Sequence, residues 1–147
     1  MQKRINISKA EPLAYKAMLG LESYLAKVEI SRALKELIKI RASQINGCAY
    51  CLDMHTKDAL KNGETHQRIF ILSAWKEATE FFTEEEQAAL AMTEEITLIH
   101  QNGLSEETYQ KASKVFSENQ IAQIMMAIIT INAWNRIAVS THLKIGG

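Results

Sequence analysis

Residues 36–55 read ELIKIRASQINGCAYCLDMH, and this stretch determines much of the expected fold. Before Asn46-Gly47 the apolar residues recur at intervals of three and four, which is the period of an amphipathic helix. Glycine commonly ends a helix because it adopts the left-handed conformation at little cost. A second helix begins at Cys48. The stretch therefore predicts a helical hairpin with a glycine turn.

The same helical period continues on both sides of the hairpin, without convincing period-two strand patterns. At 147 residues, the chain is predicted to be a single all-α domain over residues 1–147. Capping residues such as Ser31, Thr83 and Ser105 and stop signals such as Asn62-Gly63 divide it. The predicted helices span about 12–28, 31–46, 48–61, 64–78, 83–101, 105–116 and 118–142.

The composition is that of an ordinary globular protein, with 17 basic and 17 acidic residues. A balanced charge argues against nucleic-acid binding, which relies on Lys and Arg to neutralise phosphates. The one basic cluster, Lys35, Lys39 and Arg41, shares its helix with Glu36. No signal peptide is apparent, and the most apolar segment, 121–131, is too short for a membrane span. We therefore expect a cytoplasmic protein without a nucleic-acid or membrane partner.

The predicted last helix is apolar on nearly all faces between residues 121 and 131. A helix that is hydrophobic all round is either central in a core or shared with another subunit. For a domain of this size we expect a homo-oligomer, and a central core helix in a monomer is the alternative.

Cys48 and Cys51 are the only cysteines, and His55 follows Cys51 by four positions. These helical spacings predict that all three side chains lie on one face. Cys48 is near the start of its helix, where free backbone N–H groups stabilise a thiolate. A disulfide across so small a loop stabilises a fold little. The pattern favours reversible thiol chemistry, and buried structural cysteines are one alternative.

A zinc site is another alternative, because two cysteines and a histidine are ligands that zinc prefers. The sequence lacks a second Cys-x-x-Cys pair. His66, His100 and His142 do not follow a familiar ligand spacing, so we expect no metal.

Glu36 is predicted to lie near His55 across the hairpin. Glu36 precedes the turn by about ten residues and His55 follows it by about eight, which correspond to roughly 15 Å and 12 Å of helix. A carboxylate bonded to one imidazole nitrogen raises the basicity of the other. Glu36 and His55 are thus a candidate base for a cysteine thiol, and a solvent-exposed Glu36 is the alternative.

The segment resembles the core of alkylhydroperoxidase D-like (AhpD-like) proteins in the carboxymuconolactone decarboxylase (CMD) family, an all-α family. The family signature is a glutamate, eleven other residues, and then Cys-x-x-Cys-x-x-x-His, which Glu36, Cys48, Cys51 and His55 match. Residues 42–59 and 132–136 are also similar to that group.

The resemblance implies a peroxidase without metal, haem or another cofactor. Cys51 would attack an organic hydroperoxide and become a sulfenic acid, and Cys48 would condense with it. Cys48 would then exchange with an external dithiol, either lipoyl-type or thioredoxin-like. His55 would take the proton of Cys51, with Glu36 orienting it. The resemblance also implies trimers or hexamers.

One position departs from the family pattern. Tyr50 stands where well-studied AhpD proteins have a second histidine, and a neutral phenol cannot serve as the same base. The decarboxylase branch generally lacks the cysteine pair, but a carbon-acid enzyme using Glu36 and His55 remains an alternative function. A zinc-binding or interaction module is the non-enzymatic alternative.

Overall fold

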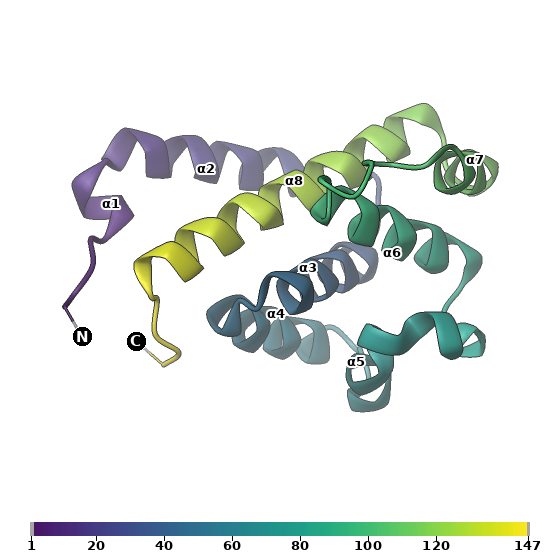
Figure 1. Ribbon diagram of the computed structural model, residues 1–147, viewed down its shortest axis with the longest axis horizontal. Helices are drawn as coiled ribbons and strands as arrows, with labels where there is room; N and C mark the ends of the chain where they lie inside the picture. The colour runs from purple at the N-terminus through teal and green to yellow at the C-terminus, as the bar shows by residue number, and fades with distance from the viewer. Residues whose placement is uncertain (1, 147) are drawn as a thin grey trace.

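The computed structural model describes residues 2–146, which form helices, turns and loops without a β-strand (Figure 1). The all-α fold class is therefore confirmed. The helices are α1 (Ile7–Ala10), α2 (Pro12–Leu25), α3 (Arg32–Asn46), α4 (Ala49–Lys61), α5 (His66–Ile71), α6 (Glu84–Thr97), α7 (Glu106–Val115) and α8 (Glu118–Thr141). Two 3₁₀ segments, η1 (Leu72–Glu77) and η2 (Thr79–Phe81), follow α5.

The predicted helix starts are confirmed by side-chain caps. Ser31, Thr83 and Ser105 each accept a backbone N–H from the first turn of α3, α6 and α7. Glu86 completes a capping box with Thr83. Gly47 ends α3 in the left-handed conformation, with φ of 64°, as the hairpin requires.

The helix predicted over residues 64–78 is wrong in its second half. The regular helix ends at Ile71, and the chain continues as 3₁₀ turns in which Ala74 has non-helical φ and ψ of −117° and 28°. This path buries Trp75, whose indole Nε1–H donates to Glu94 Oε1 at 2.9 Å. The tertiary contact of Trp75 thus overrides the local helical pattern.

Smaller differences between the predicted and observed bounds occur at the ends of other helices. The first long helix stops at Leu25 instead of 28, and α6 stops at Thr97 instead of 101. After α6, backbone bonds from Gln101 N–H to Leu98 and from Gly103 N–H to Ile99 form a turn. The short helix α1, capped by the Asn6 side chain, has no counterpart among the predicted helices.

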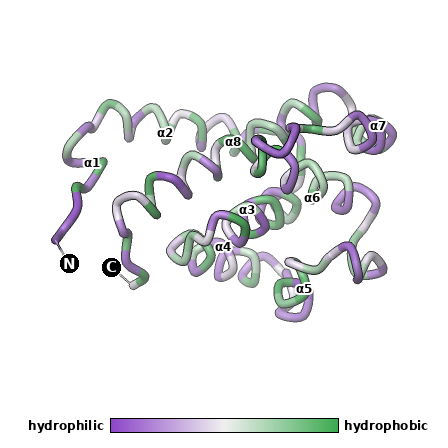
Figure 2. Tube along the Cα trace, viewed as in Figure 1, coloured by the Kyte–Doolittle hydropathy of each residue, from purple (hydrophilic) through white to green (hydrophobic). Residues whose placement is uncertain are grey.

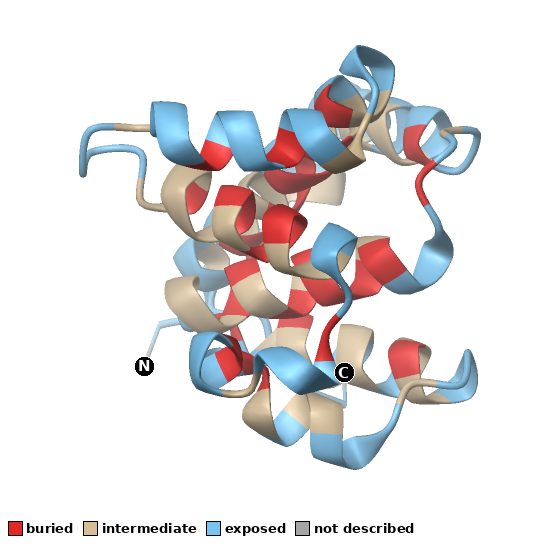
Figure 3. Cartoon of the chain, turned by 90° about the vertical axis from the view of Figure 1, so that its right-hand side faces the viewer, coloured by how far each residue is buried: buried red, intermediate tan, exposed pale blue. Residues whose placement is uncertain are grey.

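Helix α3 is central in the fold and contacts α4, α6 and α8. Buried residues lie along its inner faces (Figure 3). Ile38 packs with Ile124 and Ile128 of α8 in one core cluster, whereas Leu37 and Ile40 belong to a second cluster. The cysteines form a small separate cluster with Ala138 of α8. The start of α4 is therefore fixed between two long helices.

Apolar side chains also lie on the outside of α2 and α8. Figure 2 shows hydrophobic residues along both helices. On α2 only Leu25 is buried, whereas Leu13 and Leu19 are exposed, and on α8 Ile129 and Val139 are about half exposed. Homo-oligomer formation stays a prediction. Among the described residues, no helix has the length and apolar character that crossing a membrane requires.

Candidate active site

The turn between α3 and α4 holds the two cysteines in place. The Cys48 N–H donates to the Ser43 carbonyl at 3.0 Å, and Cys48 is the N-cap residue of α4. Its Sγ accepts the Cys51 N–H at 3.3 Å. The two Cα atoms are 5.3 Å apart and the sulfurs form a disulfide. The helix start therefore directs a hydrogen bond to Cys48 sulfur, which also favours the thiolate once the disulfide is reduced.

The structure brings Glu36 and His55 together as the hairpin geometry predicts. His55 Nδ1 lies 3.2 Å from Glu36 Oε2, and both side chains are largely buried. The ring N–H is poorly aligned for a hydrogen bond, and neither atom has a hydrogen-bond partner among the described residues, so the two groups are in close contact without a formed hydrogen bond. Such contacts often align only when substrate binds.

Lys39 contacts the same carboxylate, one turn along α3 from Glu36. Its Nζ lies 3.5 Å from Glu36 Oε1, the oxygen that does not face His55. Burial by itself would raise the pKa of Glu36, but the contacts with His55 and Lys39 outweigh it and hold the pKa below its ordinary value. Sequence reasoning noted Lys39 only as part of a basic cluster, although its i+3 spacing from Glu36 was the available signal.

A cavity of about 480 Å³ opens beside these residues. Cys51, His55 and Lys39 line it, whereas Cys48 does not. Cys48 is 1% exposed and Cys51 3%. Of the two cysteines, Cys51 is the one that a small molecule in the cavity can approach.

The opposite walls of the cavity come from segments far away in the sequence. Tyr15 and Leu19 of α2 and Leu143, beyond α8, contribute side chains. The two ends of the chain lie at the same end of the molecule (Figure 1), where Arg4 donates to the Ser140 carbonyl at 2.7 Å. No sequence pattern pointed to these wall residues.

A polar network attaches α8 to the cysteine turn. Asn46 Nδ2 donates to Asn132 Oδ1 at 3.0 Å and to Asn135 Oδ1 at 2.9 Å. Asn135 Nδ2 in turn donates to Ser43 Oγ at 3.0 Å. The segment around Asn132 and Asn135, which attracted attention only through its family likeness, therefore positions the backbone just before Cys48.

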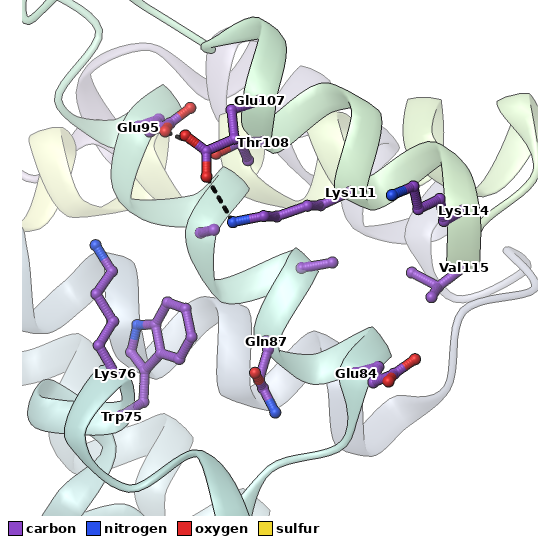
Figure 4. Close-up of a pocket in the computed structure, with 12 residues that line it drawn as sticks. Trp75, Lys76, Glu84, Gln87, Glu95, Glu107, Thr108, Lys111, Lys114 and Val115 are labelled. Atoms are coloured by element: carbon purple, nitrogen blue, oxygen red, sulfur yellow. Dashed lines mark hydrogen bonds and ion pairs between the residues drawn. The ribbon is translucent and has the colours of Figure 1, made fainter.

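A larger cavity, of about 590 Å³, lies between α6, α7 and η1 (Figure 4). It has no cysteine or histidine in its lining. Two of its lysines are already paired, Lys111 with Glu107 at 2.7 Å and Lys76 with Glu94, outside the lining, at 3.4 Å. We therefore place the chemistry at the smaller cavity beside Cys51.

The remaining histidines do not join the cysteines. His66, His100 and His142 are absent from the lining of the Cys51 cavity, and His142 ends α8 in the left-handed conformation. Within residues 2–146, no three histidine, cysteine or acidic side chains converge as possible metal ligands.

The fold and this site define an AhpD-like protein: an all-α domain in which the second cysteine of a Cys-x-x-Cys pair and a histidine line one cavity, and a buried glutamate contacts that histidine. The chain belongs to the carboxymuconolactone decarboxylase family, which it matches over residues 12–95.

Similar proteins support this assignment. The uncharacterized protein YdfG of Bacillus subtilis strain 168 is 44% identical over 140 residues, which cover 95% of each chain. An Agrobacterium tumefaciens protein of unknown function, suggested to be the antioxidant defence protein AhpD, has a structure with a TM-score of 0.92, 39% identity and 97% coverage of both chains. The debrominase Bmp8 shares the fold at 22% identity, with a TM-score of 0.83 over 95% of this chain and 74% of its own.

Proposed function

We propose that the protein is a thiol-dependent peroxidase that reduces organic hydroperoxides through a Cys48–Cys51 dithiol–disulfide cycle. The observation that carries the proposal is the meeting of Cys51 and the Glu36–His55 pair at a cavity large enough for an organic molecule. The likeness to a suggested AhpD protein supports the same role.

In the first step, His55 Nε2 takes the proton of the Cys51 thiol. The thiolate attacks the terminal peroxide oxygen, so an S–O bond forms and the O–O bond breaks. Cys51 becomes a sulfenic acid, and the leaving alkoxide takes a proton from His55 to give the alcohol. Glu36 Oε2, 3.2 Å from Nδ1, would orient the ring so that Nε2 is the free base.

In the second step, the Cys48 thiol loses its proton and attacks the Cys51 sulfur as the thiolate, so the S–S bond forms and the S–O bond breaks. The sulfenic hydroxyl takes up a proton and leaves as water. The hydrogen bond from the Cys51 N–H supports a thiolate at Cys48, and the 5.3 Å Cα separation suits a disulfide. Peroxide and dithiol are thereby converted to alcohol, water and disulfide.

An external dithiol then restores the pair by thiol–disulfide exchange and is itself oxidised. The family resemblance assigns the exchange to Cys48 and the reductant to a lipoyl-type or thioredoxin-like partner. Cys48 is buried and lies outside the cavity lining in the disulfide form, so attack there requires movement of the residues that cover it.

Tyr50 lines the cavity next to Cys51 but cannot replace the second histidine of the studied family pattern. We therefore propose a shorter relay in which His55 alone takes the thiol proton.

We also propose that the protein is a homo-oligomer, either a trimer or a hexamer. The exposed apolar side chains of α2 and α8, Leu13, Leu19 and Ile129 among them, support a further subunit contact. Light scattering coupled to gel filtration tests this directly, and a mass equal to one chain at micromolar concentration contradicts it.

Peroxide consumption with dithiothreitol as reductant tests the function. We expect Cys51→Ser to abolish it. A decarboxylase-type enzyme would need Glu36 and His55 but tolerate loss of the cysteines, and an interaction module would consume no peroxide at all. Full activity of Cys51→Ser would contradict the proposal.

A further inference from the structure

We propose that the Cys51 cavity selects bulky hydroperoxides without a negative charge and discriminates against hydroperoxides that carry a carboxylate. This inference rests on the proposed peroxidase function and adds the chemical class of its substrate. It follows from the size of the cavity, its apolar surface and the arrangement of the charges in its wall.

The cavity is much larger than hydrogen peroxide requires. Its volume of about 480 Å³ lies in the range of pockets that bind small organic ligands. Leu19, Met54 and Ile137 line it together with the rings of Tyr15 and Trp134. Burial of an apolar substituent against these side chains is favourable, and hydrogen peroxide has none to bury. An aromatic or branched alkyl hydroperoxide therefore has an advantage in binding.

The charged groups in the wall are predominantly acidic. Glu22 of α2 and Asp58 of α4 line the cavity, and neither is in an ion pair with another residue between positions 2 and 146. A substrate carboxylate would face both of them, whereas Lys35, whose charge interacts with that of Glu22, is not part of the lining.

The lysine in the described lining of the Cys51 cavity already contacts a carboxylate. Lys39 is the only lysine or arginine there, and its Nζ lies 3.5 Å from the buried Glu36. Removing Lys39 from Glu36 would leave a buried carboxylate with His55 as its sole partner, which is costly. Lys39 is therefore a poor anchor for an anionic substrate.

Glu22 is also held at the wall. Trp134 Nε1–H donates to Glu22 Oε1 at 2.9 Å, and the Trp134 ring packs edge-on against Tyr15 with centroids 5.8 Å apart. This arrangement fixes the carboxylate of Glu22 next to the apolar surface that the substrate would contact. The acidic character of the wall is thus built into the packing of α2 on α8.

The selectivity for uncharged substrates is tested with a matched pair, a hydroperoxide that carries a carboxylate and its methyl ester, alongside two reference peroxides. The probes are cumene hydroperoxide, its para-carboxylate and the methyl ester of that carboxylate, with hydrogen peroxide as the small reference. The readout is the second-order rate of thiol loss in the reduced protein. We expect the ester to react at least about tenfold faster than the carboxylate, because like charges repel strongly where water is partly excluded. Cumene hydroperoxide should likewise exceed hydrogen peroxide about tenfold.

Variants that remove one negative charge from the cavity wall identify the residues responsible for the selectivity. Asp58→Asn and Glu22→Gln should each raise the ratio of carboxylate to ester rate several-fold, and the ratio cancels any loss common to both substrates. Asp53→Asn is the matched control, because Asp53 is on the same helix but outside the cavity, paired with Lys57 at 2.8 Å. That variant should leave the ratio unchanged.

The outcomes separate the two proposals. If cumene hydroperoxide oxidises the thiols and the carboxylate reacts as fast as the ester, the selectivity is refuted and the peroxidase function stands. If the carboxylate reacts slowly, but the ratio of its rate to the ester rate is the same in wild type and in every variant, the assignment of the selectivity to Glu22 and Asp58 is refuted. If no peroxide oxidises Cys51, the peroxidase function fails and the selectivity fails with it.

Discussion

Glu36 Oε2 lies 3.2 Å from His55 Nδ1, and this contact joins the two helices of the hairpin at the level of the cavity. The carboxylate faces the nitrogen that is not needed for proton transfer. The other nitrogen is left free to serve Cys51, one helical turn earlier on α4. A single inter-helix contact therefore connects the fold of the hairpin to the reactivity of its thiol.

Replacing His55 tests its role as the base. We expect His55→Ala to lower the rate of thiol loss with cumene hydroperoxide by about 10²- to 10⁴-fold at neutral pH, the usual contribution of a positioned base. His100→Ala is the control, because His100 does not line the cavity. Equal rates for His55→Ala and wild type would remove His55 from the mechanism.

Lys39 supplies the permanent positive charge beside Glu36. In Lys39→Met, we expect the pKa of Glu36 to rise because the mutation removes a cation that helps to lower it, so the unfolding free energy should fall less between pH 7 and pH 3 than in wild type. Lys39→Arg keeps the charge and should restore the wild-type pH profile of the unfolding free energy. Identical pH profiles for Lys39→Met and wild type would contradict this role of Lys39.

Ionised Glu36 should stabilise the fold in a pH-dependent way. Its pKa is lower in the folded protein than the ordinary 4.5, so folding favours the ionised form. The stabilisation is complete above about pH 4.5 and is lost as the pH falls through the lowered pKa. The difference in unfolding free energy between wild type and Glu36→Gln, measured by urea titration, should shrink on acidification from pH 7 to pH 3. A constant difference would show that the charge is not responsible.

Asn135 should be essential for the stability of the cysteine turn. Its side chain is 1% exposed and bonds to both Asn46 and Ser43. Asn135→Ala removes both of these bonds, leaving Asn46 only its bond to Asn132 and Ser43 Oγ only its bond to the Lys39 carbonyl, and should cost about 1–3 kcal/mol in urea unfolding. Asn119→Ala, at an exposed position on the same helix, should change stability by less than about 0.5 kcal/mol. Similar values for the two variants would contradict this assignment.

The sequence allowed the hairpin and its residues to be predicted because local rules govern them. Gly47 ends α3, Ser31 and Thr83 cap their helices, and counting helical rise brings Glu36 to His55. The break before Trp75 could not be predicted in this way, since it depends on a bond to Glu94 in a different helix.

The cavity was beyond prediction for a related reason. Its walls come from α2 and the two ends of the chain, and only the tertiary fold brings Tyr15 and Leu143 to Cys51. A periodic pattern records which face of a helix is apolar but not which distant segment covers it. The charge selectivity of the site depends on Glu22 for the same reason.

The most direct test of the central claim combines intact mass with a free-thiol count of the reduced, metal-free protein, before and after one equivalent of cumene hydroperoxide. Cys48→Ser is treated identically in the presence of a sulfenate trap. The account predicts rapid loss of both thiols in wild type and a trapped adduct on Cys51 in the variant. Thiols that remain reduced in wild type, or an absence of adduct on Cys51, would contradict it.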